Sequence, residues 1–141
     1  SRTSGTDKNL SEVTFGNGTF VAVGTNEQIL TSSDNGNTWN TRVSGSGSGY
    51  LAGVAFGNGT FVAVGTTGSA TLVRTSSDNG TTWSTVNTGL SPTFYNVAFG
   101  YNTFVAVGDG GKPHTSLDNG STWTLRNSPT TTFLMGVSYK E

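Results

Sequence analysis

The chain lacks several residue types, and each absence excludes a class of protein. Cysteine is absent, which excludes a disulfide framework, a thiolate metal site and a thiol nucleophile. A single histidine, His114, cannot form a metal-binding cluster, and we expect neither a metal nor a cofactor. Charged residues make up only 11% of the chain and the net charge is −1, which argues against nucleic acid as a partner. No apolar run reaches the roughly 20 residues that a membrane-spanning helix needs.

Small polar residues dominate what is there. Serine, threonine, glycine and asparagine together account for 76 of the 141 residues. Disordered chains of this polarity usually combine high net charge with few aromatics, whereas here aromatics reach 11%. We therefore expect turns between short strands, and the same composition leads us to expect an extracellular or cell-surface location.

Two motifs repeat with the same period. Residues 15–24 (FGNGTFVAVG) recur without change at 56–65, and recur at 99–108 with Tyr101 and Asn102 in place of the Asn-Gly pair. A second motif with the pattern Ser-x-Asp-x-Gly-x-Thr-Trp stands at 32–39, 76–83 and 116–123. Two motifs that share a period of about 42 residues indicate a repeat array.

Each repeat has the pattern of four short strands. In the first repeat we predict strands at 10–15, 19–23, 28–32 and 39–43, separated by glycine- and asparagine-rich turns. Four antiparallel strands in about 40 residues are typical of a β-propeller blade. The sequence thus predicts an all-β fold with blades at about 10–43, 51–87 and 94–126, in one partial propeller that spans 1–141.

The second motif resembles the Asp-box, or bacterial neuraminidase repeat, of sialidases, some glycosidases, sortilin-like receptors and photosystem assembly factors. The resemblance covers nearly the whole chain and implies a propeller fold with these boxes at its periphery. It leaves function open, because the box occurs in propellers of unrelated activity.

The residues of the Asp-box are suited to building a turn. We expect each aspartate to accept hydrogen bonds from backbone N–H groups of its own turn, each glycine to supply a positive φ, and each tryptophan to bury its ring beneath the turn. The residues to which these structural roles are assigned are Asp34, Gly36, Trp39, Asp78, Gly80, Trp83, Asp118, Gly120 and Trp123.

Three blades are too few to close a ring, since propellers close with four to eight. Residues 133–139 align with the first strand of a blade, and we predict an extra strand there with no blade after it. Residues 2–5 align with the end of a fourth strand, and 44–49 form a serine-glycine loop that we expect to be flexible. We therefore predict a homo-oligomer, with a dimer favoured and a fibre as the alternative. The residues expected to join the copies are Phe133, Leu134, Met135, Val137 and Tyr139.

Few residues offer chemistry. Sialidase-like hydrolysis, as the resemblance implies it, needs an arginine triad, a tyrosine with a glutamate, and an acid/base aspartate, and the sequence singles out no such set. We expect no catalytic residues. Tyr50 and Tyr95 vary between repeats, and we name them as candidates for stacking on sugar rings, although packing between blades is the more common role of such aromatics.

The sequence therefore favours a non-enzymatic, self-assembling propeller module that binds glycans or builds a scaffold. Two alternatives stay open at this point. One is a structural subunit of an extracellular fibre or layer that is joined by strand exchange, and the other is a fragment of a sialidase-like glycosidase.

Overall fold

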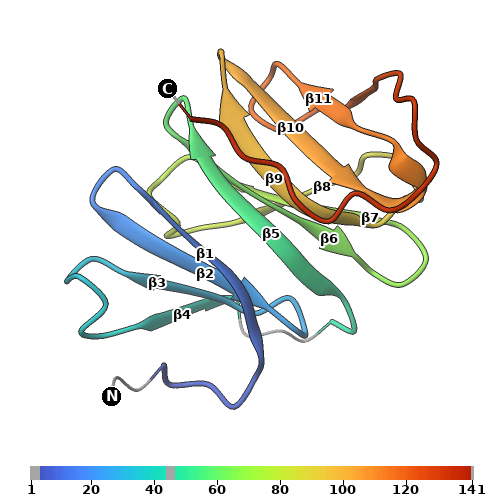
Figure 1. Cartoon of the computed structure of the whole chain (residues 1–141). Helices are drawn as coiled ribbons and strands as arrows, with labels where there is room; N and C mark the ends of the chain where they lie inside the picture. Colours follow the sequence, from blue (N-terminus) through green and yellow to red (C-terminus); the bar gives the residue numbers. More distant parts are fainter. Residues whose placement is uncertain (1–3, 44–46, 141) are drawn as a thin grey trace.

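Three antiparallel sheets make up the computed structural model, which describes residues 4–43 and 47–140 (Figure 1). The first sheet consists of β1 (Leu10–Gly16), β2 (Thr19–Gly24), β3 (Ile29–Ser32) and β4 (Asn40–Val43). The second consists of β5 (Tyr50–Gly57), β6 (Thr60–Thr66), β7 (Thr71–Ser76) and β8 (Ser84–Val86). The third consists of β9 (Phe94–Gly100), β10 (Thr103–Gly108), β11 (His114–Ser116) and β12 (Thr124–Leu125), with a short 3₁₀ turn at Asp109–Gly111.

The strands of each sheet pair in chain order, which is the arrangement of a propeller blade. The predicted all-β class and the partial propeller of blades are confirmed. We call the sheets blade 1, blade 2 and blade 3, and their ends lie within one residue of those expected from the repeat. None of the helical structure in the described residues has the length and apolarity that crossing a membrane requires.

A two-residue turn joins the first two strands of every blade. Asn17 and Gly18 adopt φ values of 46° and 78°, and Asn58 and Gly59 repeat this with 48° and 72°. Two consecutive positive φ values define a type I′ turn, which matches the twist of a hairpin and favours Asn-Gly. The third blade places Tyr101 in this conformation, at φ 47°, where a bulky residue is uncommon.

The blades pack face to face through two cores. We call the face that a blade turns toward the preceding blade its front face, and the opposite face its back face. Between blades 1 and 2 the buried apolar residues are Val21, Val23, Ile29, Leu51, Val54, Phe61, Ala63 and Leu72. Between blades 2 and 3 they are Ala55, Val62, Val64, Val73, Phe94, Val97, Phe104 and Ala106. Each blade is therefore stabilised mainly by burial against its neighbours.

Strands β1, β5 and β9 are the first strands of their blades and lie next to one another (Figure 1). Each pairs with the second strand of its blade through an irregular register near its start, between Leu10 and Glu12 in β1 and between Leu51 and Gly53 in β5. In β9 the register shifts between Phe94 and Asn96, which pair with Gly108 and Val107 of β10. Such bulges redirect a side chain, and in β9 the redirected residue is Tyr95.

The extra strand predicted at 133–139 is not formed. Among the described residues, a single backbone hydrogen bond joins this segment to blade 3, from Leu134 N–H to Gly108 O at 3.0 Å. A strand exists only when a neighbour supplies its ladder of hydrogen bonds, and in the described part of the chain no strand pairs with this segment. The segment nevertheless runs along blade 3, as the dark red trace in Figure 1 shows.

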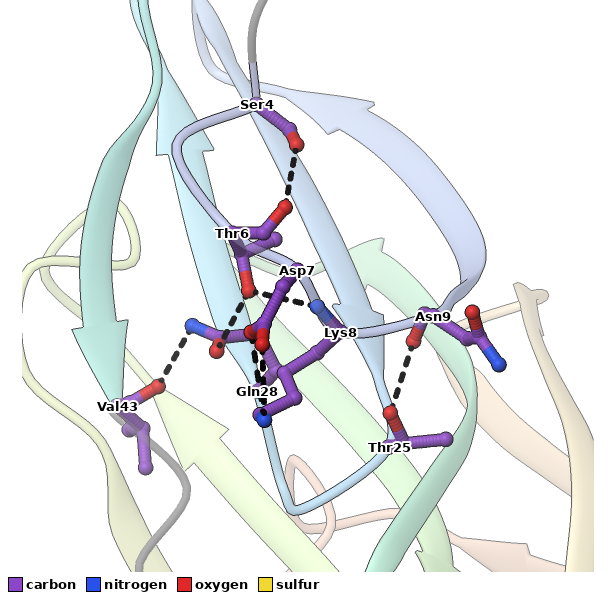
Figure 2. Close-up of polar contacts among 8 residues, drawn as sticks. All are labelled: Ser4, Thr6, Asp7, Lys8, Asn9, Thr25, Gln28 and Val43. Carbon is purple, nitrogen blue, oxygen red and sulfur yellow. Dashed lines mark hydrogen bonds and ion pairs between the residues drawn. The ribbon is translucent and has the colours of Figure 1, made fainter.

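The N-terminal residues are attached to the start of blade 1 (Figure 2). The Thr6 hydroxyl donates to Gln28 Oε1 at 3.3 Å, and Gln28 Nε2 donates to Val43 O at 3.1 Å. Thr25 N–H donates to Asn9 O at 2.9 Å. Of the fourth-strand end expected at 2–5, residues 2 and 3 lie outside the described residues, and residues 4 and 5 are not in a strand. Part of the loop expected at 44–49 lies outside them too.

Candidate functional site

The two ends of the blades carry different chemistry. The turn end holds the two-residue turns and the Asp-boxes, because the chain reverses there between the first and second strands and between the third and fourth. The loop end is the opposite one, where β1, β5 and β9 begin and the chain passes from blade to blade. The turn end holds most of the residues singled out from the sequence.

At the turn end the Asp-box aspartates are bonded within their own turns. Asp78 Oδ1 accepts hydrogen bonds from Ser76 Oγ at 2.8 Å and from Thr82 N–H at 2.9 Å, while Oδ2 accepts from the Thr82 hydroxyl at 2.7 Å. Ser76 Oγ in turn accepts from Gly80 N–H at 2.9 Å. The boxes around Asp34 and Asp118 repeat this pattern. Their carboxylates are thus occupied by local contacts.

These hydrogen bonds favour the charged form of the carboxylates. The bond from the Thr38 hydroxyl, with the Thr38 and Ser32 bonds that accompany it, lowers the pKa of Asp34 from 3.8 to about 2. The Thr82 hydroxyl does the same for Asp78, whose pKa also falls to about 2. At Asp118, burial acts to raise the pKa, but the hydrogen bonds from Thr122 and Ser116 outweigh it and the pKa is lowered.

The Asp-boxes also contact the preceding blade. Gly80 approaches Thr31 and Val21 of blade 1, and Gly120 approaches Val62 and Thr75 of blade 2. Trp83 and Trp123 donate from Nε1 to Gly80 O and Gly120 O at 2.9 and 3.0 Å, which holds each ring against its turn. Trp39 makes no such bond among the described residues, and its blade has no blade before it there.

A pair of asparagine side chains links each hairpin turn to the next Asp-box. Asn17 Nδ2 donates to Asn79 Oδ1 at 2.6 Å between blades 1 and 2, and Asn58 Nδ2 donates to Asn119 Oδ1 at 3.0 Å between blades 2 and 3. In blade 3 the corresponding residue is Tyr101. Its ring lies 5.3 Å from the ring of Tyr139, at an angle of 67°. The repeat therefore departs from its pattern where blade 3 meets residues 133–139.

Away from the Asp-boxes, Glu12 links the first strands of the blades. Its Oε2 accepts from Val54 N–H in β5 at 2.7 Å, and its Oε1 accepts from Asn96 Nδ2 in β9 at 3.2 Å. Gly53 leaves the space for this, because a Cβ there would lie 2.9 Å from the Asn96 Cα and 3.2 Å from Glu12 Oε2. One carboxylate thus connects three blades.

Two further acids make contacts near the loop end. Glu27 forms an ion pair with Arg74 of blade 2, and both side chains are largely buried. Asp109 accepts from the Tyr95 hydroxyl at 2.7 Å and from Thr93 N–H at 3.0 Å. The Tyr95 hydrogen bond lowers the pKa of Asp109, and the same bond raises the pKa of Tyr95.

Tyr95 forms an aromatic pair with Phe133 at the loop end. Its ring lies 6.2 Å from the ring of Phe133 in an edge-to-face arrangement. Phe133 is 65% exposed and Met135 is 68% exposed. Tyr50 opens β5 and is partly exposed, and among the described residues no ring contact joins it to Tyr95. Thus Tyr95 and Phe133, predicted for two different roles, are neighbours, whereas Tyr50 and Tyr95 are not in contact.

The remaining candidate residues lie along blade 3. Val137 and Tyr139 line a small cavity of about 140 Å³ together with Ala98 and Val105. A Cβ on Gly100 would overlap the ring of Tyr139, as a Cβ on Gly57 would overlap Phe99. His114 is buried in β11 against Phe94, and burial lowers its pKa. No group of three or more potential metal ligands occurs in the described residues.

The motifs of the repeat do not point to three acids that make these contacts, Glu12, Glu27 and Asp109. Each breaks the repeat: Gly53 and Asn96 occupy the positions equivalent to Glu12, and Thr25 and Thr66 those equivalent to Asp109. The signal that could have found them was therefore a charged residue at a position where the other repeats are neutral.

The fold and the arrangement of the blades define a class, the β-propellers. Within it, the chain is similar to two solved structures of YCF48. One, YCF48 bound to D1 peptide, matches with a TM-score of 0.73 at 19% identity over 89% of this chain and 42% of that chain. The other, YCF48 from Cyanidioschyzon merolae, matches with a TM-score of 0.68 at 23% identity over 85% of this chain and 37% of that chain.

At these identities the likeness establishes the propeller fold alone. The chain spans less than half the length of either YCF48 chain. No family model matches it, and no curated protein matches it significantly.

Proposed function

We propose that the chain is a non-catalytic β-propeller module that binds a polypeptide segment at its loop end. The observation that carries this proposal is the ring pair of Tyr95 and Phe133 at the loop end, in which Phe133 is 65% exposed. Exposed apolar groups of this kind, next to polar loops, are typical of interaction sites. Asp109 fixes the orientation of Tyr95 through its hydroxyl, so the ring is held ready for a partner.

The comparison with solved propellers supports a polypeptide as the partner. A YCF48 structure with the same fold is bound to D1 peptide. For this chain we propose a polypeptide segment that is extended and apolar.

The proposal that the module is not an enzyme is supported by the contacts of its charged groups. Glu12, Glu27 and Asp109 are all held by partners within the fold. The arginines are engaged too, with Arg42 bonded to Thr31, Arg74 to Glu27 and Arg126 to Thr115. A sialidase-like site would need such groups to converge on a substrate, and the described residues offer no convergent set.

A glycan is the second candidate ligand. The observation that favours it is Tyr95 itself, an aromatic ring polarised by Asp109 and suited to stacking on a sugar. Self-association is proposed as well, through the exposed front face of blade 1, since residues 133–139 already occupy part of the back face of blade 3. The extracellular or cell-surface location stays a prediction from composition.

Peptide and glycan arrays test the proposal directly. We expect the wild-type chain to retain apolar peptides, and the variant Phe133→Ser with Tyr95→Ala to lose them. Leu117→Ser is the matched control, because Leu117 is 70% exposed on an Asp-box at the turn end. Glycan binding without peptide binding would show that the ligand is a sugar and not a peptide. Turnover of a glycoside would contradict the non-catalytic role.

A further inference from the structure

Residues 133–139 repeat the apolar pattern of the first strand of a blade. Leu134, Val137 and Tyr139 stand where β5 has Leu51, Val54 and Phe56 and where β1 has Leu10, Val13 and Phe15. The match extends to packing, because Tyr139 covers Gly100 of blade 3 as Phe56 covers Gly16 of blade 1. The segment therefore lies in the position of the first strand of a fourth blade.

What distinguishes this segment from β1, β5 and β9 is its outer edge. In every blade the outer edge of the first strand is paired with the second strand along its length. In the described part of the chain, Gly136 and Ser138 make no backbone hydrogen bond. An unpaired edge of this kind is a template for another strand.

The geometry of the complete blades tells which backbone groups face that edge. The two-residue turn makes Gly16 and Thr19 a hydrogen-bonded pair, so that Thr14 and Glu12 are hydrogen-bonded to β2 as well. The backbone N–H groups of the intervening residues face away from the second strand. The bond from Val54 N–H to Glu12 of the preceding blade shows this direction. By this equivalence the N–H groups of Gly136 and Ser138 face the open edge, and that of Val137 faces the blades.

We infer that this edge accepts an extended polypeptide segment with the pattern Thr-Phe-Val-Ala-Val-Gly, as a new strand. The pattern is that of β2, β6 and β10, the strands that fill this position in the three blades. The expected register places the phenylalanine opposite Tyr139 and the alanine opposite Val137, as Phe20 and Ala22 stand opposite Phe15 and Val13.

A second copy of the chain is a poor source for this strand. In the described residues every strand with this pattern already pairs on both sides, β2 with β1 and β3, β6 with β5 and β7, and β10 with β9 and β11. A free strand of this kind therefore has to come from outside the described residues. The site differs from the group around Tyr95, so it does not depend on the proposed function.

The probe is a labelled synthetic peptide with the sequence of residues 16–24, titrated against the full chain by fluorescence anisotropy. We expect saturable binding to the wild-type chain. Gly136→Pro removes one of the edge N–H groups without removing an apolar contact, and should weaken binding at least tenfold. Gly136→Ala is the matched control, because no atom lies within 4 Å of a Cβ at this position and the N–H group is kept.

Three results would overturn the inference. The first is absence of binding to the wild-type chain, and the second is equal affinity for the Gly136→Pro and Gly136→Ala variants. The third is self-association of the chain without peptide that Gly136→Pro abolishes, since that would make a second copy the occupant. Loss of peptide binding here would leave the loop-end array result unchanged, so that the two proposals fail separately.

Discussion

At the residue scale, the hydrogen bonds of the Asp-box change the pKa of its aspartate, which can be measured. The carboxylates of Asp34 and Asp78 accept several hydrogen bonds each, and these bonds are made to the ionised form. A serine, a threonine and a backbone N–H thus hold each negative charge within one turn. The motif serves the turn, and the turn in blades 2 and 3 lies against the preceding blade.

We predict that the protein loses stability in acid between about pH 4 and pH 2. The pKa of both Asp34 and Asp78 falls from 3.8 to about 2 in the folded state, so each contributes stability that is complete above the unfolded value. That contribution is lost as the pH falls through the folded value. Urea unfolding midpoints measured across this range should therefore decrease steadily toward low pH.

The variant Asp34→Asn with Asp78→Asn should show a shallower dependence on pH over the same range and lower stability at neutral pH. Asp7→Asn is the control, because it removes a carboxylate that lies outside the Asp-boxes. An acid dependence that is as steep in the Asp-box variant as in the wild type would show that these carboxylates do not cause it.

At the scale of the elements, the repeat made most of the fold predictable and left the connections between blades unpredictable. The strands follow from apolar alternation and turn residues that occur three times. Glu12, by contrast, connects β1 to β5 and β9 through contacts that occur once. A contact between blades depends on which residues face each other after packing, and the pattern of one repeat does not contain that information.

The segment at 133–139 shows the other limit of sequence prediction. Its apolar pattern is that of a first strand, and it lies where a first strand would. It is not a strand, because strand structure is a property of a pair. Tyr50 and Tyr95 share variability between repeats, but they are not neighbours. The ring next to Tyr95 is that of Phe133, which belongs to the segment that follows blade 3.

Close packing between elements gives a second prediction. Gly57 lies beneath the ring of Phe99, and a Cβ there would overlap it. We expect Gly57→Ala to push blade 3 away from blade 2 and to lower the free energy of unfolding by about 2 kcal/mol, typical of overpacking. The tryptophan emission should shift to longer wavelength, because Trp123 packs in the core between these blades.

Gly59→Ala is the matched control for Gly57→Ala. Gly59 has a φ of 72° and no atom within 4 Å of a Cβ, so its substitution tests backbone strain without a clash. We expect a loss of about 1 kcal/mol for a left-handed alanine, with tryptophan emission unchanged. Equal emission shifts in the two variants would contradict a specific contact between Gly57 and Phe99.

At the scale of the whole molecule, the two outer faces of the array differ. Blade 3 has part of its back face covered by residues 133–139. None of the described residues covers the front face of blade 1 in this way, and Leu10, Val13 and Trp39 line a groove of about 510 Å³ there. The equivalents of this surface in blades 2 and 3 are buried in the two cores, so we expect its partner to be another apolar blade face.

We predict that the isolated chain associates through the front face of blade 1, and that light scattering gives a multiple of its 14.6 kDa mass. The pair Val13→Glu and Phe15→Glu should restore the monomer mass, because charges on this surface disfavour burial of a second copy. Folding should survive, since Val13 is 55% and Phe15 is 56% exposed.

The repeat offers a matched control for this experiment. Val54 occupies in blade 2 the position of Val13 in blade 1, yet it is only 3% exposed because blade 1 covers it. Val54→Glu would bury an unpaired charge in the first core, and we expect it to unfold the chain where Val13→Glu does not. Monomer mass for the wild type, or equal damage from glutamate at positions 13 and 54, would contradict an open blade face as the site of association. Valine-to-glutamate substitutions at one blade position thus distinguish the uncovered face of blade 1 from the covered face of blade 2.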